Sequence, residues 1–476
     1  MPQTLINIIR GDKISDKTDY RDALAVNMIA VPKPILGANG YMLCYPGLTS
    51  VATPPGTDRG AVYNDRFGVH FRVSGNKLIK VVGGVVTELG TVAGKGQVAM
   101  PYSFNSQCVI ADGNMYLYDP VNGFSPVTDA DLGSPIDAVW VDGYYFMTDG
   151  EYIFHTDLVP EASAAPYTFE STIDPLKFAT AEFMPDRSLG VAKTQDNKVI
   201  VFGRNTIEYF VNAATEAFAF SRVANRAQKI GIVATHAKVE VDNTFYFVGS
   251  RKDQSLGVHI LGVGSSVKIS SREIDKILAQ YTDLELADMR METRMQDNVT
   301  FVLIHLPNEC LCFNVEVAKA FGVDTAWCLL QTGKNGQAYR GINGIYDSSS
   351  GQWIAGDKYA FNLGIIDNTV FTQYGIAQEW YLFTPFINLE TMSVDEMQVE
   401  TIPGNNITDD AKVAMSTTTD GQNYNTEWWE LYGQPLDYNH RFTLYRLGYV
   451  NQWIGFRLRG YTTSRMAFAG MKLTYG

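Results

Sequence analysis

The stretch Gln107-Cys-Val-Ile-Ala-Asp-Gly-Asn-Met-Tyr-Leu-Tyr118 holds two apolar runs joined by a tight polar elbow. Asp-Gly and Asn-bearing pairs supply the positive φ that two-residue hairpin turns require. Elbows of this kind recur along the chain, at Gly75-Asn76, Asp112-Gly113, Asp142-Gly143, Asp196-Asn197, Asp242-Asn243, Asp297-Asn298 and Ser350-Gly351. Hairpins repeated in this way predict stacked β-units, most economically the blades of a propeller.

We expect the propeller to span residues 59–378 and to have about six blades. The elbows at 112 and 142 are close together, which suggests that one blade carries two of them. Prolines crowd residues 158–185, which we interpret as an insertion or a connection between blades. Residues 1–58 are polar and then punctuated by proline, a pattern typical of an extended arm.

Two other segments break the hairpin pattern. Residues 271–281 predict one prominent helix, because a serine cap precedes an apolar stripe of Ile274, Ile277, Leu278 and Tyr281. From residue 379 to 476 the expected strands lengthen and alternate. This part therefore predicts a β-sandwich, jelly-roll-like, and makes the fold all-β.

Composition limits the function. Charged residues make up 19% of the 476 residues and aromatic residues 12%, which is typical of a large, well-packed β protein that hides surface in an oligomer. The net charge of −13 argues against general affinity for nucleic acid, although an acidic wall would let DNA slide past. The five cysteines are too few and too oddly spaced for a disulfide framework or a zinc site, so we expect buried thiols. The sequence shows neither a signal peptide nor a membrane span.

No residue pattern predicts catalysis. Asp420-Gly421 lies in a stretch that resembles the Asp-box hairpin of sialidases, which is a structural turn. Glu208 lies in a strand whose alternation predicts a solvated face, and Asp395 lacks a recognisable catalytic context. The six histidines are scattered, and we expect His305 to be a satisfied core or edge histidine. We therefore expect no enzyme, no cofactor and no metal site.

The C-terminal arginines are the candidate site. No acidic residue follows Asp437, whereas Glu390 to Asp437 is rich in carboxylates. One interpretation is that strands of opposite charge pair within the sandwich. The other is a basic patch that meets an acidic neighbour or DNA, with Arg441, Arg446, Arg457 and Arg459 as the interface residues. Alternation places Phe456 and Leu458 inside and the last two arginines outside.

Short segments in the same order along the chain resemble the packaged DNA stabilisation proteins, the tail hub or nozzle proteins of short-tailed, Salmonella-type podophages. The arm from Tyr20 to Gly47 carries the resemblance first. The further segments are Asn205 to Phe210, Gln228 to Gly231, Ile304 to Pro307, Tyr339 to Gly341, Gly356 to Lys358, Leu382 to Pro385, Thr418 to Gly421 and Ile454 to Arg459.

The resemblance implies a component of the virion tail, made in the host cytoplasm. It implies a homo-oligomeric ring, a hexamer by expectation, beneath the portal and adaptor or head-completion ring. Such a ring would extend and close the DNA exit channel, retain packaged double-stranded DNA, and carry the needle and the tailspikes or fibres. The alternatives are a carbohydrate-binding or carbohydrate-active propeller and a cellular scaffold.

Overall fold

The computed structural model describes residues 2–9, 11–14, 20–158, 173–181, 183–401, 411–438 and 440–476. The chain divides into two compact units, which we describe one at a time. The first unit consists of residues 1–49, 294–340 and 366–476, and the second of residues 50–293 and 341–365. Of the interpreted insertion at 158–185, residues 159–172 and 182 lie outside the described residues.

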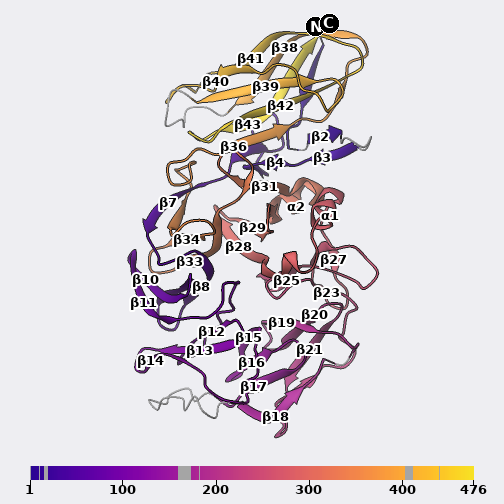
Figure 1. The fold of residues 1–476 in the computed structure, drawn as a ribbon. Coiled ribbons are helices and arrows are strands. Elements are labelled where there is room, and N and C mark those ends of the chain that lie inside the picture. Colours follow the sequence, from indigo (N-terminus) through magenta and orange to yellow (C-terminus); the bar gives the residue numbers. More distant parts are fainter. Residues whose placement is uncertain are drawn as a thin grey trace. The chain divides into compact units, whose positions relative to one another are not determined.

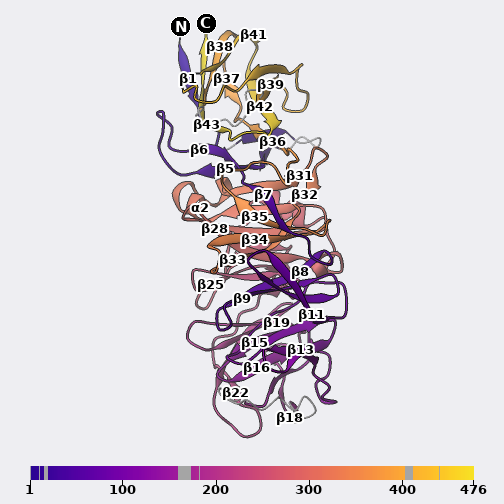
Figure 2. The same ribbon diagram turned by 90° about the vertical axis from the view of Figure 1, so that its left-hand side faces the viewer.

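The second unit is built from antiparallel meanders of three to five strands (Figure 1). The first three sheets are β8 (Asp58–Asn64), β9 (Val69–Ser74), β10 (Lys77–Val82) and β11 (Val85–Thr91); β12 (Gln107–Ala111), β13 (Asn114–Asp119) and β14 (Gly123–Pro126); and β15 (Asp137–Val141), β16 (Tyr144–Thr148), β17 (Ile153–Thr156) and β18 (Ile173–Ala179). The next two are β19 (Ser188–Lys193), β20 (Val199–Gly203), β21 (Ile207–Asn212) and β22 (Phe220–Arg222); and β23 (Gly231–Ile232), β24 (Lys238–Val241), β25 (Thr244–Ser250), β26 (Gly257–Ile260) and β27 (Val267–Lys268). Figure 2 shows the sixth sheet, which is formed by β33 (Gly341–Asp347), β34 (Gln352–Asp357), β35 (Leu363–Asp367) and β7 (Gly47–Ala52), the last two reaching past the unit boundary.

The elbows make the hairpin turns that the sequence predicts. Asp112 and Gly113 have φ of 51° and 72°, and Asp242 and Asn243 have φ of 47° and 64°. Each of the seven elbows lies in a meander of its own, where it joins two neighbouring strands. The interpretation that one blade carries two elbows is therefore wrong, because the turns at 112 and 142 belong to the sheets of β12 and of β15. Six of the seven meanders lie in the second unit.

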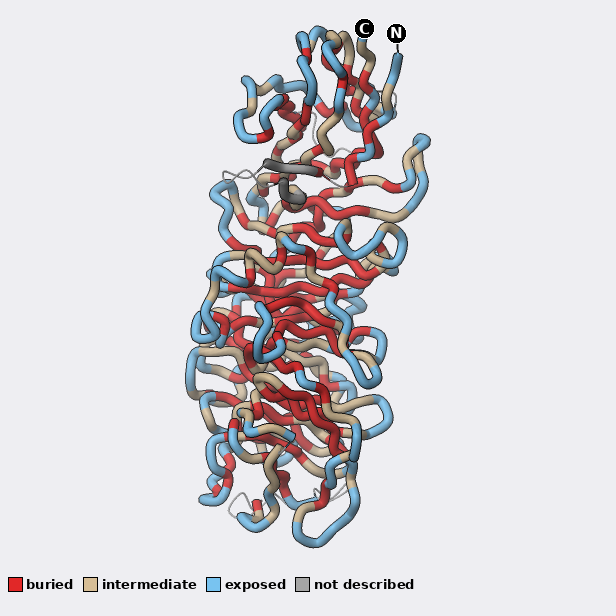
Figure 3. Tube along the Cα trace, turned by 90° about the vertical axis from the view of Figure 1, so that its right-hand side faces the viewer, coloured by how far each residue is buried: buried red, intermediate tan, exposed pale blue. Residues whose placement is uncertain are grey.

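Neighbouring meanders pack face to face. One apolar cluster joins Cys108 and Leu117 to Tyr145 and Met147 of the next sheet, and others join β9 to β13 and β16 to β21. All five residues of β12 and of β20 are consequently buried, and Figure 3 shows this burial along the strands. Strands covered on both faces read as continuous apolar runs rather than as alternating ones.

The first unit holds most of two further sheets. Their strands from residues 379–476 form the C-terminal sandwich, and four strands of the second sheet, within residues 290–332, form the seventh meander. One has the order β41 (Phe442–Val450), β38 (Met392–Thr401), β43 (Ala467–Tyr475), β6 (Tyr41–Cys44) and β5 (Met28–Val31), with β1 (Gln3–Ile6) also on β43. The other has the order β28 (Arg290–Gln296), β29 (Val299–His305), β30 (Cys310–Asn314), β31 (Trp327–Thr332), β4 (Ala25–Val26), β36 (Glu379–Phe383), β42 (Trp453–Tyr461), β39 (Lys412–Thr418) and β40 (Trp428–Leu431). Short strands β32 (Gln337–Ala338) and β37 (Ile387–Asn388) pair with β31 and β42, and β2 (Gly11–Ile14) pairs with β3 (Tyr20–Ala23).

Strands of the N-terminal residues are built into these sheets. Gln3 pairs with Thr474, and Met42 pairs with Phe468. The two ends of the chain therefore lie side by side in the first unit (Figures 1 and 2).

The predicted helix is confirmed and a second helix was missed. Helix α1 (Arg272–Leu278) begins at Ser271, whose hydroxyl accepts a hydrogen bond from the Ile274 N–H. Helix α2 (Val315–Phe321) begins at Asn314, whose side chain accepts from the Val317 N–H. Its β-branched valines directly follow β30, so in the sequence the segment resembles a continuing strand. Two single 3-10 turns, η1 (Glu285–Asp288) and η2 (Val323–Thr325), follow these helices.

Candidate interaction surface

Strand β42 presents alternate residues to the two faces of its sheet. Phe456 and Leu458 are 1% and 0% exposed, which confirms that the apolar pair faces inward. Arg457 and Arg459 lie on the opposite face, with 24% and 23% of their side chains exposed. Small residues lie beside them on β39, because Ala414 and Ser416 pair with the two arginines in register. Both guanidinium groups consequently lie over the sheet.

Arg459 is held by carboxylates of the same unit. Its Nε and Nη2 donate to the two oxygens of Glu427 at 2.5 and 2.6 Å, and its Nη1 donates to Glu379 at 2.6 Å. The hydrogen bonds from Arg459 hold the pKa of Glu427 below its usual value, and the hydrogen bond to Glu427 raises the pKa of Arg459. This is the forked geometry that makes an Arg–carboxylate pair rigid.

Aromatic rings complete the face. The guanidinium carbon of Arg457 lies 4.3 Å from the ring centre of Tyr424, and that of Arg459 lies 5.2 Å from Trp429. Trp429 is in turn nearly parallel to Tyr461, at 6.3 Å between ring centres. Cation–π contacts of this kind favour a fixed side-chain position. These two arginines are therefore paired with carboxylates of their own unit, as in the first of the two interpretations. Their role in an interface stays a prediction.

Of the other two candidate arginines, Arg446 lies in edge strand β41 and Arg441 directly precedes this strand. Arg441 and Arg446 are exposed, and no ion pair of either is found among the described residues. Arg446 lies in a β-bulge opposite β38 and has a φ of 58°. Beside it, Tyr445 and Tyr449 are 68% and 66% exposed. Bulges redirect side chains from an edge, and Tyr and Arg are enriched at protein interfaces.

The carboxylates considered for catalysis have structural partners. Asp420 accepts hydrogen bonds from the backbone of Gln422 and Asn423 and from the Thr418 hydroxyl. The Asn423 backbone contributes most to holding the pKa of Asp420 below its usual value. Asp420 therefore ties a turn, as the sequence predicted. Asp395 accepts from the Ser393 hydroxyl at 3.3 Å.

Glu208 corrects one expectation. Its side chain is buried rather than solvated, because β21 is covered on both faces and four consecutive residues of this strand are buried. One oxygen accepts from the Phe183 N–H at 3.0 Å, and the other lies 3.5 Å from Arg222. Burying a charge costs free energy unless the charge is paired, so loss of either partner should destabilise this strand.

The cysteines and histidines do not assemble into a metal site in the described part of the chain. Cys44, Cys108, Cys310, Cys312 and Cys328 are free and buried. Burial raises the pKa of Cys44 to about 12. Within the described residues, His, Cys, Asp and Glu form no group of three or more that could hold a metal. In the same residues, no helix has the length and apolar character needed to cross a bilayer.

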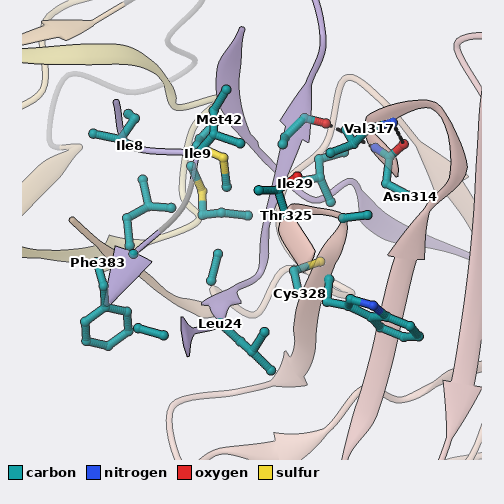
Figure 4. A pocket seen from close by; sticks show the side chains of 18 of the residues that line it. Ile8, Ile9, Leu24, Ile29, Met42, Asn314, Val317, Thr325, Cys328 and Phe383 are labelled. Atoms are coloured by element: carbon teal, nitrogen blue, oxygen red, sulfur yellow. Dashed lines mark hydrogen bonds between the residues drawn. The ribbon is translucent and has the colours of Figure 1, made fainter. Parts of the chain in front are cut away.

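The first unit encloses one small cavity between the N-terminal strands and β31 (Figure 4). Its volume is about 30 Å³, which holds a water molecule and no larger ligand. Ile9, Met42 and Cys328 are among its mostly apolar walls. The amide of Asn314 caps α2 and donates to the Ala30 carbonyl at 3.1 Å, so this polar group serves the fold.

Two family models match consecutive stretches of the chain. Residues 4–371 match the bacteriophage P22 Gp10 β-propeller, and residues 379–476 match the bacteriophage P22 Gp10 β-sandwich. One relative is the tail hub protein gp10 of Salmonella phage P22, with 32% identity over 488 residues that cover 99% of both chains.

Solved structures share parts of the architecture. A streptogramin B lyase structure aligns with 68% of this chain and 97% of its own, at 10% identity and a TM-score of 0.41. The Cps50 (Swd1) β-propeller domain of Myceliophteria thermophila aligns with 65% of this chain and 96% of its own, at 8% identity and a TM-score of 0.38. At TM-scores below 0.5 we conclude nothing about this chain from them.

Proposed function

Because this chain belongs to the bacteriophage P22 Gp10 family, we propose that it is a structural tail hub protein of a phage virion. The observation that carries the proposal is the full-length similarity to a tail hub protein, which includes both the propeller and the sandwich. The chain is an all-β propeller followed by a sandwich, and such an architecture is a scaffold whose fold alone assigns no chemistry.

In this proposal, identical chains assemble into a ring, a hexamer by expectation, beneath the portal and adaptor. The ring would extend and close the exit channel, retain packaged DNA, and attach the needle and the tailspikes or fibres. The chain would be made in the host cytoplasm and then built into the virion tail. The mechanism is mechanical, without a catalysed reaction, so we propose that the protein is not an enzyme.

The charge distribution supports a channel role. Between Lys95 and Lys177 the sequence contains many carboxylates and no lysine or arginine. Among the described residues of this stretch, the exposed carboxylates are Asp112, Asp131, Asp142, Glu151 and Asp157. A negative surface repels the DNA phosphates, so DNA that passed it would stay mobile.

We propose that Arg441 and Arg446, the two exposed candidate arginines, make contacts between chains within the ring. No ion pair of Arg441 or Arg446 is found among the described residues. Arg446 adjoins the exposed Tyr445 on the sheet edge, and Arg441 directly precedes the same strand. Arg457 and Arg459 would support the sandwich from within.

Electron microscopy of the purified chain, alone and mixed with the adaptor ring of the same phage, tests the function. We expect a ring of six copies that seats on the adaptor. Particles that stay monomeric and never dock on the adaptor would overturn the proposal.

A further inference from the structure

A groove of about 490 Å³ lies in the second unit between the sheet of β19–β22 and the sheet of β23–β27. Beneath it the two sheets are joined by packed rings, with Phe202 and Phe245 6.0 Å apart at their centres. Ile200, Phe245 and Leu261 form its floor and are 1%, 7% and 7% exposed, whereas Val263 is the exposed apolar residue of its lining. A groove of this volume is in the range that binds a ligand or a few residues of a peptide.

The walls of the groove are fixed by hydrogen bonds. On one side, the Thr194 hydroxyl donates to Asp196 at 2.6 Å, and Lys198 donates to the same carboxylate. On the other side, the amide of Gln228 donates to the Gly262 carbonyl at 2.9 Å. Val263 follows on this wall and is 87% exposed. The groove is therefore largely formed before any ligand arrives, which lowers the entropic cost of binding.

Arg226 supplies the charge of the groove. Its guanidinium carbon lies 5.3 Å from the ring centre of Tyr209, so the side chain has a fixed platform. No ion pair of Arg226 is found among the described residues, whereas Asp196 in the same groove is already paired with Lys198. A guanidinium beside an apolar wall attracts a carboxylate, with which it can form two parallel hydrogen bonds.

We propose that this groove binds an extended segment of a partner protein in which an Asp or Glu adjoins an aliphatic side chain. The carboxylate pairs with Arg226, and the aliphatic side chain contacts Val263, the exposed apolar residue of the lining. Charge complementarity identifies the occupant, because the one unpaired charge of the groove is a cation. The proposal is independent of the proposed tail function, since it rests on the groove alone.

The aromatic rings favour a peptide over a sugar. Tyr209 and Phe245 are each 7% exposed, and the guanidinium of Arg226 lies over the former ring. Sugars bind largely by stacking on exposed ring faces, and this groove offers little such surface. An aliphatic side chain needs only a small apolar contact, which the exposed Val263 supplies.

A random nine-residue peptide library displayed on yeast tests the inference with the full chain as bait. Peptides are selected on the wild type, and a parallel selection is made on Arg226→Met. We expect the selected peptides to be enriched in Asp or Glu next to Leu, Ile or Val. Absence of acidic enrichment would overturn the proposal.

One selected peptide, fluorescently labelled, is then titrated by anisotropy. We expect at least tenfold weaker binding to Arg226→Met and to Val263→Asp, whose new carboxylate repels the ligand. The same loss is expected when Gln or Asn replaces the acid of the peptide. Lys252→Met removes an exposed cation of the same unit and should change nothing. Equal thermal midpoints show that the variants are folded, and unchanged affinity in folded Arg226→Met would refute the proposal.

Discussion

Arg459 and Glu427 form a forked ion pair on the outer face of the sandwich, with two hydrogen bonds of 2.5 and 2.6 Å. The pair is about four-fifths buried on both sides, since the side chains are 23% and 19% exposed. Arg457 shares the same carboxylate at 3.2 Å. One glutamate therefore neutralises two neighbouring arginines of one strand, and its removal leaves both without that partner.

Glu427→Ala should lower the free energy of unfolding by about 1.5–3 kcal/mol, the range for hydrogen bonds to charged groups. The reason is that two partly buried guanidinium groups lose a carboxylate. Glu430→Ala is the matched control, because Glu430 is an exposed residue of β40 and we expect no measurable change. Urea unfolding followed by tryptophan fluorescence measures both variants. Equal losses in the two variants would contradict the prediction.

The four candidate arginines should separate into two classes. Arg441→Ala with Arg446→Ala should weaken ring or adaptor assembly at least fivefold, most visibly at raised salt, and leave the monomer folded. Arg457→Ala with Arg459→Ala should lower the unfolding free energy and let the folded fraction assemble normally, because these side chains are paired internally.

Analytical ultracentrifugation across a salt series, with circular dichroism on the same samples, distinguishes the classes. Normal assembly of the Arg441 and Arg446 double variant would remove β41 from the interface. If the Arg457 and Arg459 double variant folds but does not assemble, β42 is instead part of the interface.

Local features of the sequence predicted the hairpins and the inward face of β42. A turn needs positive φ at one or two residues, so Asp112-Gly113 identifies it without knowledge of the rest of the fold. Alternation likewise separates Phe456 from Arg457, because one side of this sheet is a core and the other is partly solvated. The serine cap and apolar stripe of α1 are local in the same sense.

Features that depend on distant partners were not predictable. Glu208 has the alternation of a solvated face, yet the strand is covered on both sides by neighbouring sheets. Its partner N–H belongs to Phe183, and no local signal joins the two residues. The pairing of Gln3 with Thr474 connects the two ends of the chain, and single-strand patterns cannot specify such a register.

The carboxylates considered for glycan chemistry should be structural. The wild type should release no reducing ends from bacterial surface polysaccharides above the blank, and Glu208→Ala, Asp395→Ala and Asp420→Ala should not differ from it. Glu208→Ala should lower the unfolding free energy, because the Phe183 N–H and Arg222 lose a buried partner. A reducing-end assay and urea unfolding measure the two effects. A hydrolysis rate that disappears in one folded variant would establish an enzyme.

Acid should destabilise the second unit through His259. Burial, and then the charge of Lys268, lower the pKa of this histidine to about 4. An unfolded histidine has a pKa of about 6.5, so between these values the unfolded chain binds a proton that the folded chain excludes. The unfolding free energy should therefore fall as the pH drops from about 6.5 to about 4, by up to about 1.4 kcal/mol per pH unit for this one proton. In His259→Gln the unfolding free energy should fall less steeply with decreasing pH, by that amount per pH unit. Part of the fall should remain, because burial also lowers the pKa values of His70 and His236. Urea unfolding at several pH values measures both slopes, and identical slopes would show that His259 does not titrate on unfolding in this range.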